Sequence, residues 1–135
     1  IKSFLHDTVG IDTNTFRLSD GSGVSRYNYS SPGHFIKLLT WAYNDKVIRN
    51  QFLSTFPIGG WDGTLEDRMK NEESTVKIIA KTGTLSGASC LSGYILTTRG
   101  GPLAFSILMN GYVGEAKPFR NLQDRIVSAL TEIKL

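Results

Sequence analysis

The stretch STVKIIAKTG, residues 74–83, decides the fold more than any other part of the chain. Its β-branched residues Val76, Ile78 and Ile79 favour extended backbone and predict a strand over residues 75–82. Two apolar runs that follow predict strands over residues 91–98 and 103–112. Because the connections between the three runs are short, we expect the strands to pair in an antiparallel sheet.

Helices are predicted before and after this group of strands along the chain. Ser31 followed by Pro32 is a typical helix start, and apolar residues recur behind it at helical spacing, which predicts a helix over residues 32–44. Shorter helical segments are expected over residues 1–8, 47–52 and 65–71. Thr64 is expected to cap the segment over residues 65–71.

The two ends of the chain also read as helical. Residues 1–8 are predicted to be the last turns of a helix that began before this chain, and the inward-facing residues are expected to be Phe4, Leu5 and Thr8. Pro118 begins a final helix. The expected apolar face of that helix consists of Phe119, Leu122, Ile126, Leu130 and Ile133.

The composition is that of one small domain. The chain has 135 residues, of which 40% are hydrophobic, and a net charge of +3 from scattered basic residues. No basic stripe is interleaved with aromatic residues, so no nucleic-acid partner is expected. No apolar run reaches the length of about 18 residues that a membrane-crossing helix needs. The start IKSFLHDTVG lacks an initiating Met, and we expect a mature or excised piece of a protein.

Cysteine and histidine chemistry is not indicated. The single cysteine, Cys90, allows no internal disulfide and stands among small residues, which favours a buried structural role. No cluster of His, Cys and carboxylate residues has the spacing of metal ligands. We therefore expect neither a metal nor another cofactor.

The opening stretch contains a Ser-x-x-Lys pattern at Ser74 and Lys77. A lysine can activate a serine three residues earlier when both share one face of a helix. In a strand, residues three apart point to opposite faces, so these two side chains would not meet. We interpret the pattern as a polar strand start that carries a solvated lysine.

The same stretch ends in Lys-Thr-Gly, which begins at Lys81. Lys81 can offer a cation to a carboxylate or assist proton transfer, and Thr82 and Thr84 can present hydroxyls on one side. Gly83 lets a ligand backbone lie close to the strand. The tripeptide alone is equally compatible with a functional motif and with an ordinary strand end, so the neighbouring sequence must decide between these two interpretations.

Three stretches together resemble the class C low-molecular-mass penicillin-binding proteins, which are D-alanyl-D-alanine carboxypeptidases and endopeptidases. They are SDGSGVSRYN at residues 19–28 (the first block), FPIGGWDGTLEDRM at 56–69 (the second block) and AKTGTLSG at 80–87 (the third block). The first block differs from the family form DGSGLSRxN at Val24. The second block has Phe56 in place of the Leu of LPxxGxDGTLxxR and has Arg68 as the arginine of that pattern.

The resemblance implies an α+β fold of the β-lactamase/DD-peptidase type, with an antiparallel sheet in a three-layer arrangement. It also implies that residues 1–135 are the C-terminal part of a penicillin-binding domain. The family has two upstream motifs, a Ser-x-x-Lys that carries the nucleophile and a Ser-x-Asn. This chain has no Ser-x-Asn, and Ser25 to Asn28 is Ser-x-x-Asn. We therefore expect the chain to lack the nucleophile and to be inactive alone.

The resemblance also implies roles for individual residues. Lys81, Thr82 and Gly83 would be the catalytic Lys-Thr-Gly element, with Lys81 and Thr82 holding the terminal carboxylate of a D-Ala-D-Ala peptide or a β-lactam. Thr84 would give its backbone N–H to an oxyanion hole, and Ser86 would border the leaving group.

Within the first block, Val24 and Arg26 lie near the substrate side-chain pocket in this family. For Arg26 an equally good interpretation is a structural one, in which it pairs with Asp20 or with a carbonyl. In the second block, Asp62, Gly63 and Arg68 are interpreted as structural.

The expected partners are peptidoglycan stem peptides, β-lactams and the N-terminal part of the same protein, in a periplasmic or extracytoplasmic location with or without membrane association. A non-catalytic wall-binding or assembly module on the same scaffold is the alternative, although the intact Lys81 and Thr82 argue against it. A class A β-lactamase is disfavoured because the first and second blocks do not belong to that family. Carboxypeptidase and endopeptidase activity are not distinguished.

Overall fold

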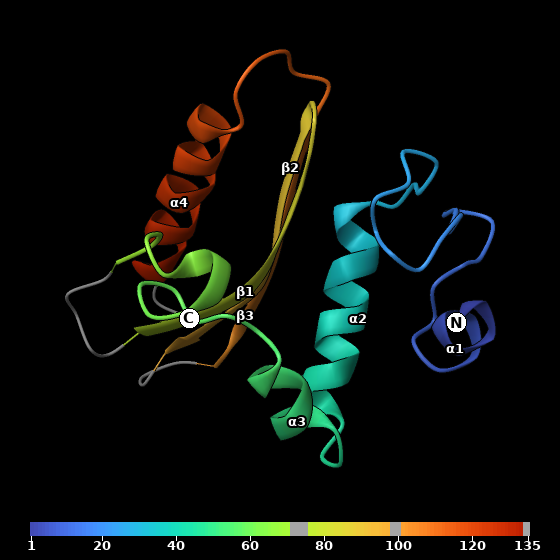
Figure 1. Ribbon diagram of the computed structural model, residues 1–135. Coiled ribbons are helices and arrows are strands. Elements are labelled where there is room, and N and C mark those ends of the chain that lie inside the picture. Colours follow the sequence, from blue (N-terminus) through green and yellow to red (C-terminus); the bar gives the residue numbers. More distant parts are fainter. Residues whose placement is uncertain (71–75, 98–100, 134–135) are drawn as a thin grey trace.

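The computed structural model describes residues 1–70, 76–97 and 101–133 of the chain. It is a small α+β domain (Figure 1). Its elements are α1 (Lys2–Asp7), α2 (Pro32–Asn44), α3 (Arg49–Ser54), the 3-10 helix η1 (Gly63–Leu65), β1 (Val76–Leu85), β2 (Ala88–Thr97), β3 (Leu103–Asn110) and α4 (Lys117–Thr131). The three strands form one antiparallel sheet in the order β1-β2-β3, which confirms the predicted pairing.

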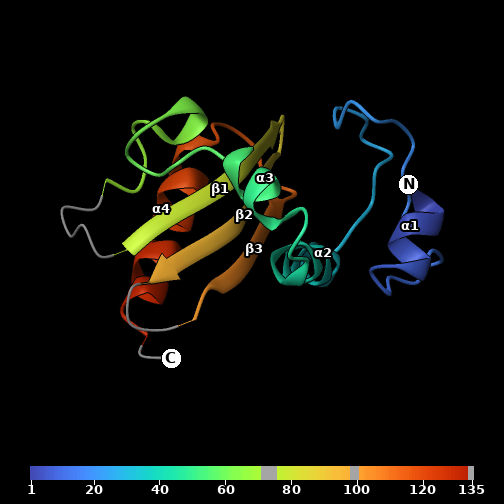
Figure 2. The same cartoon turned by 90° about the horizontal axis from the view of Figure 1, so that it is seen from below.

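Helices cover both faces of this sheet (Figures 1 and 2). The face toward α4 carries a core of buried residues: Leu65, Met69, Ile78, Ala80, Leu91, Ile95, Phe105 and Val127. The face toward α2 and α3 carries a second core, in which Leu39 of α2 packs with Ile79 and Tyr94 of the sheet. The alternation of Ile78, Ile79 and Ala80 between the two cores is the period of two that an extended strand imposes.

Tyr94 fixes α2 against the sheet. Its hydroxyl donates a hydrogen bond of 2.6 Å to the backbone carbonyl of Leu39, one of the two buried residues of that helix. Burial raises the pKa of the Tyr94 phenol well above its ordinary value. The helix over residues 32–44 begins and ends where the sequence predicts, with Ser31 and His34 forming a capping box at its start.

The predicted apolar face of the last helix is only partly correct: Phe119, Ile126 and Leu130 are half-buried, but the buried side is rotated toward Gln123 and Val127. Gln123 and Val127 are the buried residues of α4, whereas Leu122 and Ile133 are 44% and 50% exposed. Leu130 does pack against the core. This rotation occurs because Gln123, a polar residue outside the predicted apolar face, is buried by its hydrogen bonds to Arg68 and Ser89.

The segment after Thr64 is not the predicted α-helix. Thr64 lies inside η1 rather than at a cap, and Met69 adopts a positive φ of 54° that ends any helical run. The N–H of Gly60 bonds the carbonyls of Leu65 and Arg68 at 2.9 and 2.7 Å. These carbonyls therefore hold a loop together instead of continuing a helix.

The N-terminal helix α1 buries none of its residues, contrary to the expectation for Phe4, Leu5 and Thr8. Thr8 is exposed, and Leu5 is only partly buried. Phe4 makes an edge-to-face contact with Trp41 of α2, with ring centroids 4.9 Å apart, while remaining 41% exposed. Among the described residues, no helix is both long enough and apolar enough to cross a bilayer.

Candidate active site at the Lys-Thr-Gly strand

The Lys-Thr-Gly sequence lies in the second half of β1, at an edge of the sheet. On one side, Lys81 and Gly83 pair with Ser92 and Cys90 of β2. On the other side, the second block pairs with β1 only as far as Ala80, whose N–H donates to the carbonyl of Pro57 at 3.0 Å. Backbone groups of a strand alternate between its two edges, so the N–H groups of Thr82 and Thr84 point to the same edge as that of Ala80. In the described part of the chain, no backbone group pairs with them.

The side chains of this stretch divide between the two faces of the sheet. By alternation from the two cores, Lys81 and Gly83 lie on the α2 side, and Thr82 and Thr84 lie on the α4 side. Lys81 is exposed, and its Nζ donates a hydrogen bond of 2.8 Å to the carbonyl of Thr82. The ammonium group therefore lies at the open edge of β1.

The second block contacts the Lys-Thr-Gly strand through a pair of hydroxyls. The Thr82 hydroxyl donates to Thr64 Oγ1 at 3.0 Å, so η1 lies beside the open edge. Asp62, interpreted as structural from the sequence, accepts a hydrogen bond of 2.6 Å from the N–H of Ile58. This bond closes the loop that places Thr64.

The first block contacts the third block through Arg26. Arg26 Nη2 donates to the carbonyl of Ser86 at 3.0 Å, which is the pairing with a carbonyl that its structural interpretation anticipated. Asp20 does not bind Arg26; its carboxylate accepts hydrogen bonds from Ser22 at 2.7 Å and Asn28 at 2.8 Å. These two bonds hold the pKa of Asp20 below its ordinary value. Val24, on the same turn, is 64% exposed.

Arg68 of the second block is the centre of a buried polar group of residues. Its guanidinium bonds Asp124 through Nη2 at 2.7 Å and Nε at 3.1 Å, and it bonds Gln123 Oε1 at 3.1 Å. Both partners belong to α4, 55 and 56 residues away along the chain. Neither partner was predicted from the sequence. The only available signal was a glutamine at helical spacing from Val127, on what would otherwise be an apolar face.

Two further side chains line the α2 side of the strand. Ser92, opposite Lys81, shares a hydrogen bond of 2.8 Å with Ser106 of β3, so a polar row crosses the sheet beside Lys81. Cys90, opposite Gly83, is half-buried, and burial raises the pKa of its thiol. A raised pKa disfavours the thiolate, in keeping with the structural role predicted for this cysteine.

Ser74 of the Ser-x-x-Lys pattern lies outside the described residues. Lys77 lies on β1 and is exposed. The interpretation of this pattern as a strand start therefore stays a prediction.

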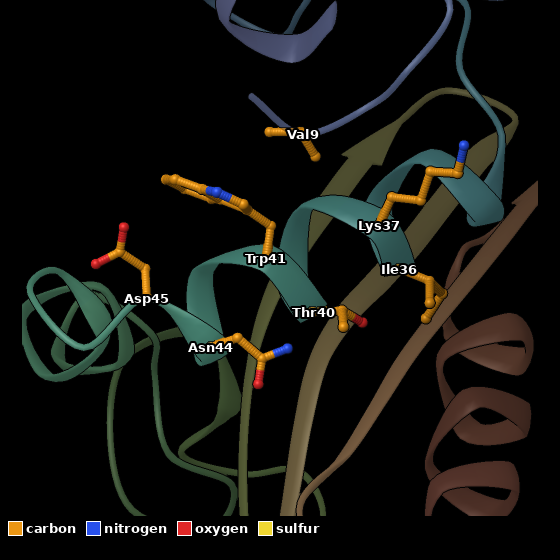
Figure 3. Close-up of a pocket in the computed structure, with 7 residues that line it drawn as sticks. All are labelled: Val9, Ile36, Lys37, Thr40, Trp41, Asn44 and Asp45. Atoms are coloured by element: carbon orange, nitrogen blue, oxygen red, sulfur yellow. The ribbon is translucent and has the colours of Figure 1, made fainter. Parts of the chain in front are cut away.

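A surface depression of about 570 Å³ lies elsewhere, between α2 and the segment after α1 (Figure 3). Its lining residues are Val9, Ile36, Lys37, Thr40, Trp41, Asn44 and Asp45, and none of them belongs to the three blocks. Trp41 and Asp45 point away from the sheet in Figure 3. The depression is separate from the Lys-Thr-Gly edge.

Known proteins are similar to this chain in sequence and in fold. The chain is 38% identical over 129 residues to a D-alanyl-D-alanine carboxypeptidase of Actinomadura sp., an alignment that covers 92% of the chain and 23% of the relative. It is 36% identical over 115 residues to the D-alanyl-D-alanine carboxypeptidase DacB of Haemophilus influenzae, covering 83% of the chain and 23% of the relative. The chain thus spans about a quarter of the length of these curated relatives.

Solved structures agree with these matches. The crystal structure of penicillin binding protein 4 (dacB) from Haemophilus influenzae matches with a TM-score of 0.80 and 29% identity, over 98% of this chain and 31% of that one. The same protein complexed with a β-lactam matches with a TM-score of 0.77 and 31% identity, over 96% of this chain and 31% of that one. The family model described as D-Ala-D-Ala carboxypeptidase 3 (S13) matches residues 1–133. The chain belongs to the D-Ala-D-Ala carboxypeptidase 3 (S13) family.

Proposed function

We propose that residues 1–135 are the C-terminal part of the penicillin-binding domain of a serine-type D-Ala-D-Ala carboxypeptidase or endopeptidase that acts on peptidoglycan stem peptides. The observation that carries this proposal is the open edge of β1 at residues 81–84, which the second block contacts through Thr64, while the first block binds the turn just beyond it through Arg26 and the Ser86 carbonyl. Family membership supports the same reaction class.

The open edge suits a short peptide that ends in a carboxylate. An extended peptide can add to a strand edge through main-chain hydrogen bonds, here with the N–H groups of Thr82 and Thr84. The Lys81 ammonium, already at that edge, can bind the terminal carboxylate by a charge-assisted hydrogen bond. The Thr82 hydroxyl would join it by turning its proton from Thr64 Oγ1 to the ligand. A β-lactam carries a comparable carboxylate and would use the same groups.

The nucleophilic serine would come from a part of the full-length protein outside these residues. Its Oγ attacks the carbonyl of the scissile D-alanyl bond, the terminal D-Ala leaves as an amine, and water then hydrolyses the acyl-serine ester. The Thr84 N–H would bind the oxyanion that forms, an interaction worth roughly 3–4 kcal/mol in other acyl-transfer enzymes. Because the substrate is the cell wall, the site of action would be extracytoplasmic.

Labelling with a fluorescent penicillin tests this proposal. We expect a covalent band on a denaturing gel for the full-length protein and none for the 135-residue chain. A band for the chain that disappears with Ser74→Ala would show that Ser74 is the nucleophile after all. Reversible binding of a D-Ala-D-Ala peptide to the full-length protein, without any covalent band, would favour the non-catalytic wall-binding module.

A further inference from the structure

A fully buried amide connects α4 to the strand that pairs with the Lys-Thr-Gly edge. Gln123 is 0% exposed, and its Nε2 donates to the carbonyl of Ser89 at 3.0 Å and to Ser89 Oγ at 3.2 Å. Its Oε1 accepts from Arg68 Nη2 at 3.1 Å. Donor and acceptor ends of the amide are thus both used, and only one orientation of the side chain satisfies them.

Asp124 and Arg120 hold the arginine in place. The Arg68 side chain is 13% exposed and forms an ion pair of 2.7 Å with Asp124, while Nη2 also reaches the carbonyl of Arg120 at 3.4 Å. The bonds from Nη2 and Nε to Asp124 fix the plane of the guanidinium, so the second N–H of Nη2 has a defined direction, toward Gln123. Arg68 of the second block therefore contacts Gln123 of α4, which in turn contacts Ser89 of β2.

The far end of this series lies beside the residue expected to stabilise the oxyanion. Ser89, which is 1% exposed, is the cross-strand partner of Thr84. The turn beyond them is anchored at two more points, by Arg26 on the carbonyl of Ser86 and by the N–H of Gly111 on the carbonyl of Gly87 at 2.9 Å. Movement of β2 at Ser89 would carry the Thr84 amide with it, because the residues on either side of Thr84 pair with those on either side of Ser89 in one ladder.

Packing alone does not require an amide at this position. The neighbouring core residue one helical turn later is Val127, and apart from Ser89 the buried residues on this face of the sheet are apolar. A buried polar group stabilises a fold only when every atom is paired, and an apolar residue of similar volume commonly serves as well. Directional hydrogen bonds supply something that apolar packing does not, namely a fixed position for one backbone segment.

We propose that Gln123 is a positioning residue for the acyl-transfer reaction: oriented by Arg68, it holds β2 at Ser89 and thereby sets the place of the Thr84 amide. The inference rests on the proposed function. Gln123 touches neither substrate nor reacting atoms. Its effect should fall on the acylation step and leave the Lys81-dependent binding of the carboxylate largely intact.

The test uses the full-length protein with Gln123→Met, which keeps the side-chain length and removes both ends of the amide. Stopped-flow acylation by a chromogenic β-lactam separates the dissociation constant of the first complex from the acylation rate constant. We expect the rate constant to fall about tenfold, since small misplacements of a catalytic group have large effects on rate, and the dissociation constant to change less than about twofold.

Val127→Ala is the matched control, because Val127 is also fully buried on α4 but has no polar contact. This variant should melt at a lower temperature and still acylate at the wild-type rate at temperatures where it is folded. If Gln123→Met fails to fold, Arg68→Lys serves instead, because lysine can pair with Asp124 but lacks the planar fork that holds Asp124 and Gln123 in a fixed geometry. A drop of about threefold in its acylation rate constant is then expected.

Wild-type acylation by the folded Gln123→Met or Arg68→Lys protein would overturn the inference, as would a loss of rate shared equally with Val127→Ala. Failure of the proposed function looks different. In that case the unsubstituted full-length protein forms no covalent adduct, before any variant is compared.

Discussion

The α4 side of the sheet and the N-terminal region are held together in different ways. Between the sheet and α4, buried apolar residues lie beside the hydrogen-bonded side chains of Arg68, Gln123 and Asp124. The first block instead is stabilised by short-range hydrogen bonds around Asp20, and it reaches the strand through the exposed side chain of Arg26. The Lys-Thr-Gly edge is thus supported rigidly from one side and contacted from the other by a loop that mainly holds itself together.

The largest loss of stability is expected from Gly93→Ala, which disturbs the sheet between the two regions. A Cβ at Gly93 would collide with the carbonyl oxygen of Ile79 and the backbone of Ala80 on the neighbouring strand. The two strands would have to separate where they contribute residues to both cores. We therefore expect a loss of about 3 kcal/mol in the free energy of unfolding. Urea denaturation measures it. Gly101→Ala, where an added Cβ meets nothing within 4 Å, should leave the stability unchanged.

Removal of the carboxylate that pairs with Arg68 should have the next largest effect. Asp124→Ala leaves a guanidinium that is only 13% exposed without its charged partner, and a loss of about 2 kcal/mol is expected. The exposed pair of Lys70 and Asp67 is the comparison, since its side chains are 65% and 87% exposed. Asp67→Ala should change stability by less than about 0.5 kcal/mol. Equal losses of unfolding free energy in Asp124→Ala and Asp67→Ala would mean that the ion pair on α4 stabilises the fold no more than an exposed pair does.

Tyr94→Phe tests the bond between the sheet and α2. Loss of the hydrogen bond to the Leu39 carbonyl should cost about 1 kcal/mol at neutral pH. The raised pKa of Tyr94 in the folded state gives this residue a pH signature. Stability is unaffected below the unfolded-state pKa of about 10 and falls as the pH rises above it, because the unfolded chain loses the proton first. The Phe variant should lack this part of the alkaline decline, which denaturation at several pH values would detect.

The smallest effect is expected from Asp20→Ala in the first block. The lowered pKa of Asp20 means that its hydrogen bonds stabilise the turn above the unfolded-state pKa of about 4 and are lost as the pH falls through the folded-state value. Amide hydrogen exchange should therefore speed up within residues 19–28 and remain unchanged in β1 and α4. Faster exchange throughout the sheet would show that the first block is part of the same cooperative unit.

The sequence predicted those features whose determinants lie close together along the chain. The helix over residues 32–44 follows from Ser31, Pro32 and a local apolar repeat, and the strand at Lys81 follows from its β-branched residues. For a structural Arg26 the expected partner was Asp20 or a carbonyl, and only the contact with Ser86 shows which partner the fold uses.

The features that were missed depend on distant partners. Gln123 is buried because Arg68 and Ser89 satisfy its amide, and the hydrophobic repeat of α4 contains no sign of either. Thr64 lies in a 3-10 turn because Gly60 takes the carbonyls that a helix would have used. Tertiary hydrogen bonds overrode local propensity at both places.

We expect the Lys81 ammonium at the open edge of β1 to recognise a carboxylate. The most direct measurement compares acylation of the full-length protein by a β-lactam and by the methyl ester of the same β-lactam, for the wild type and for Lys81→Met. We predict that the wild type prefers the free acid by at least about tenfold, the size of one charge-assisted contact, and that Lys81→Met loses this preference while its reaction with the ester is nearly unchanged. An equal preference for the acid in both proteins would contradict the account.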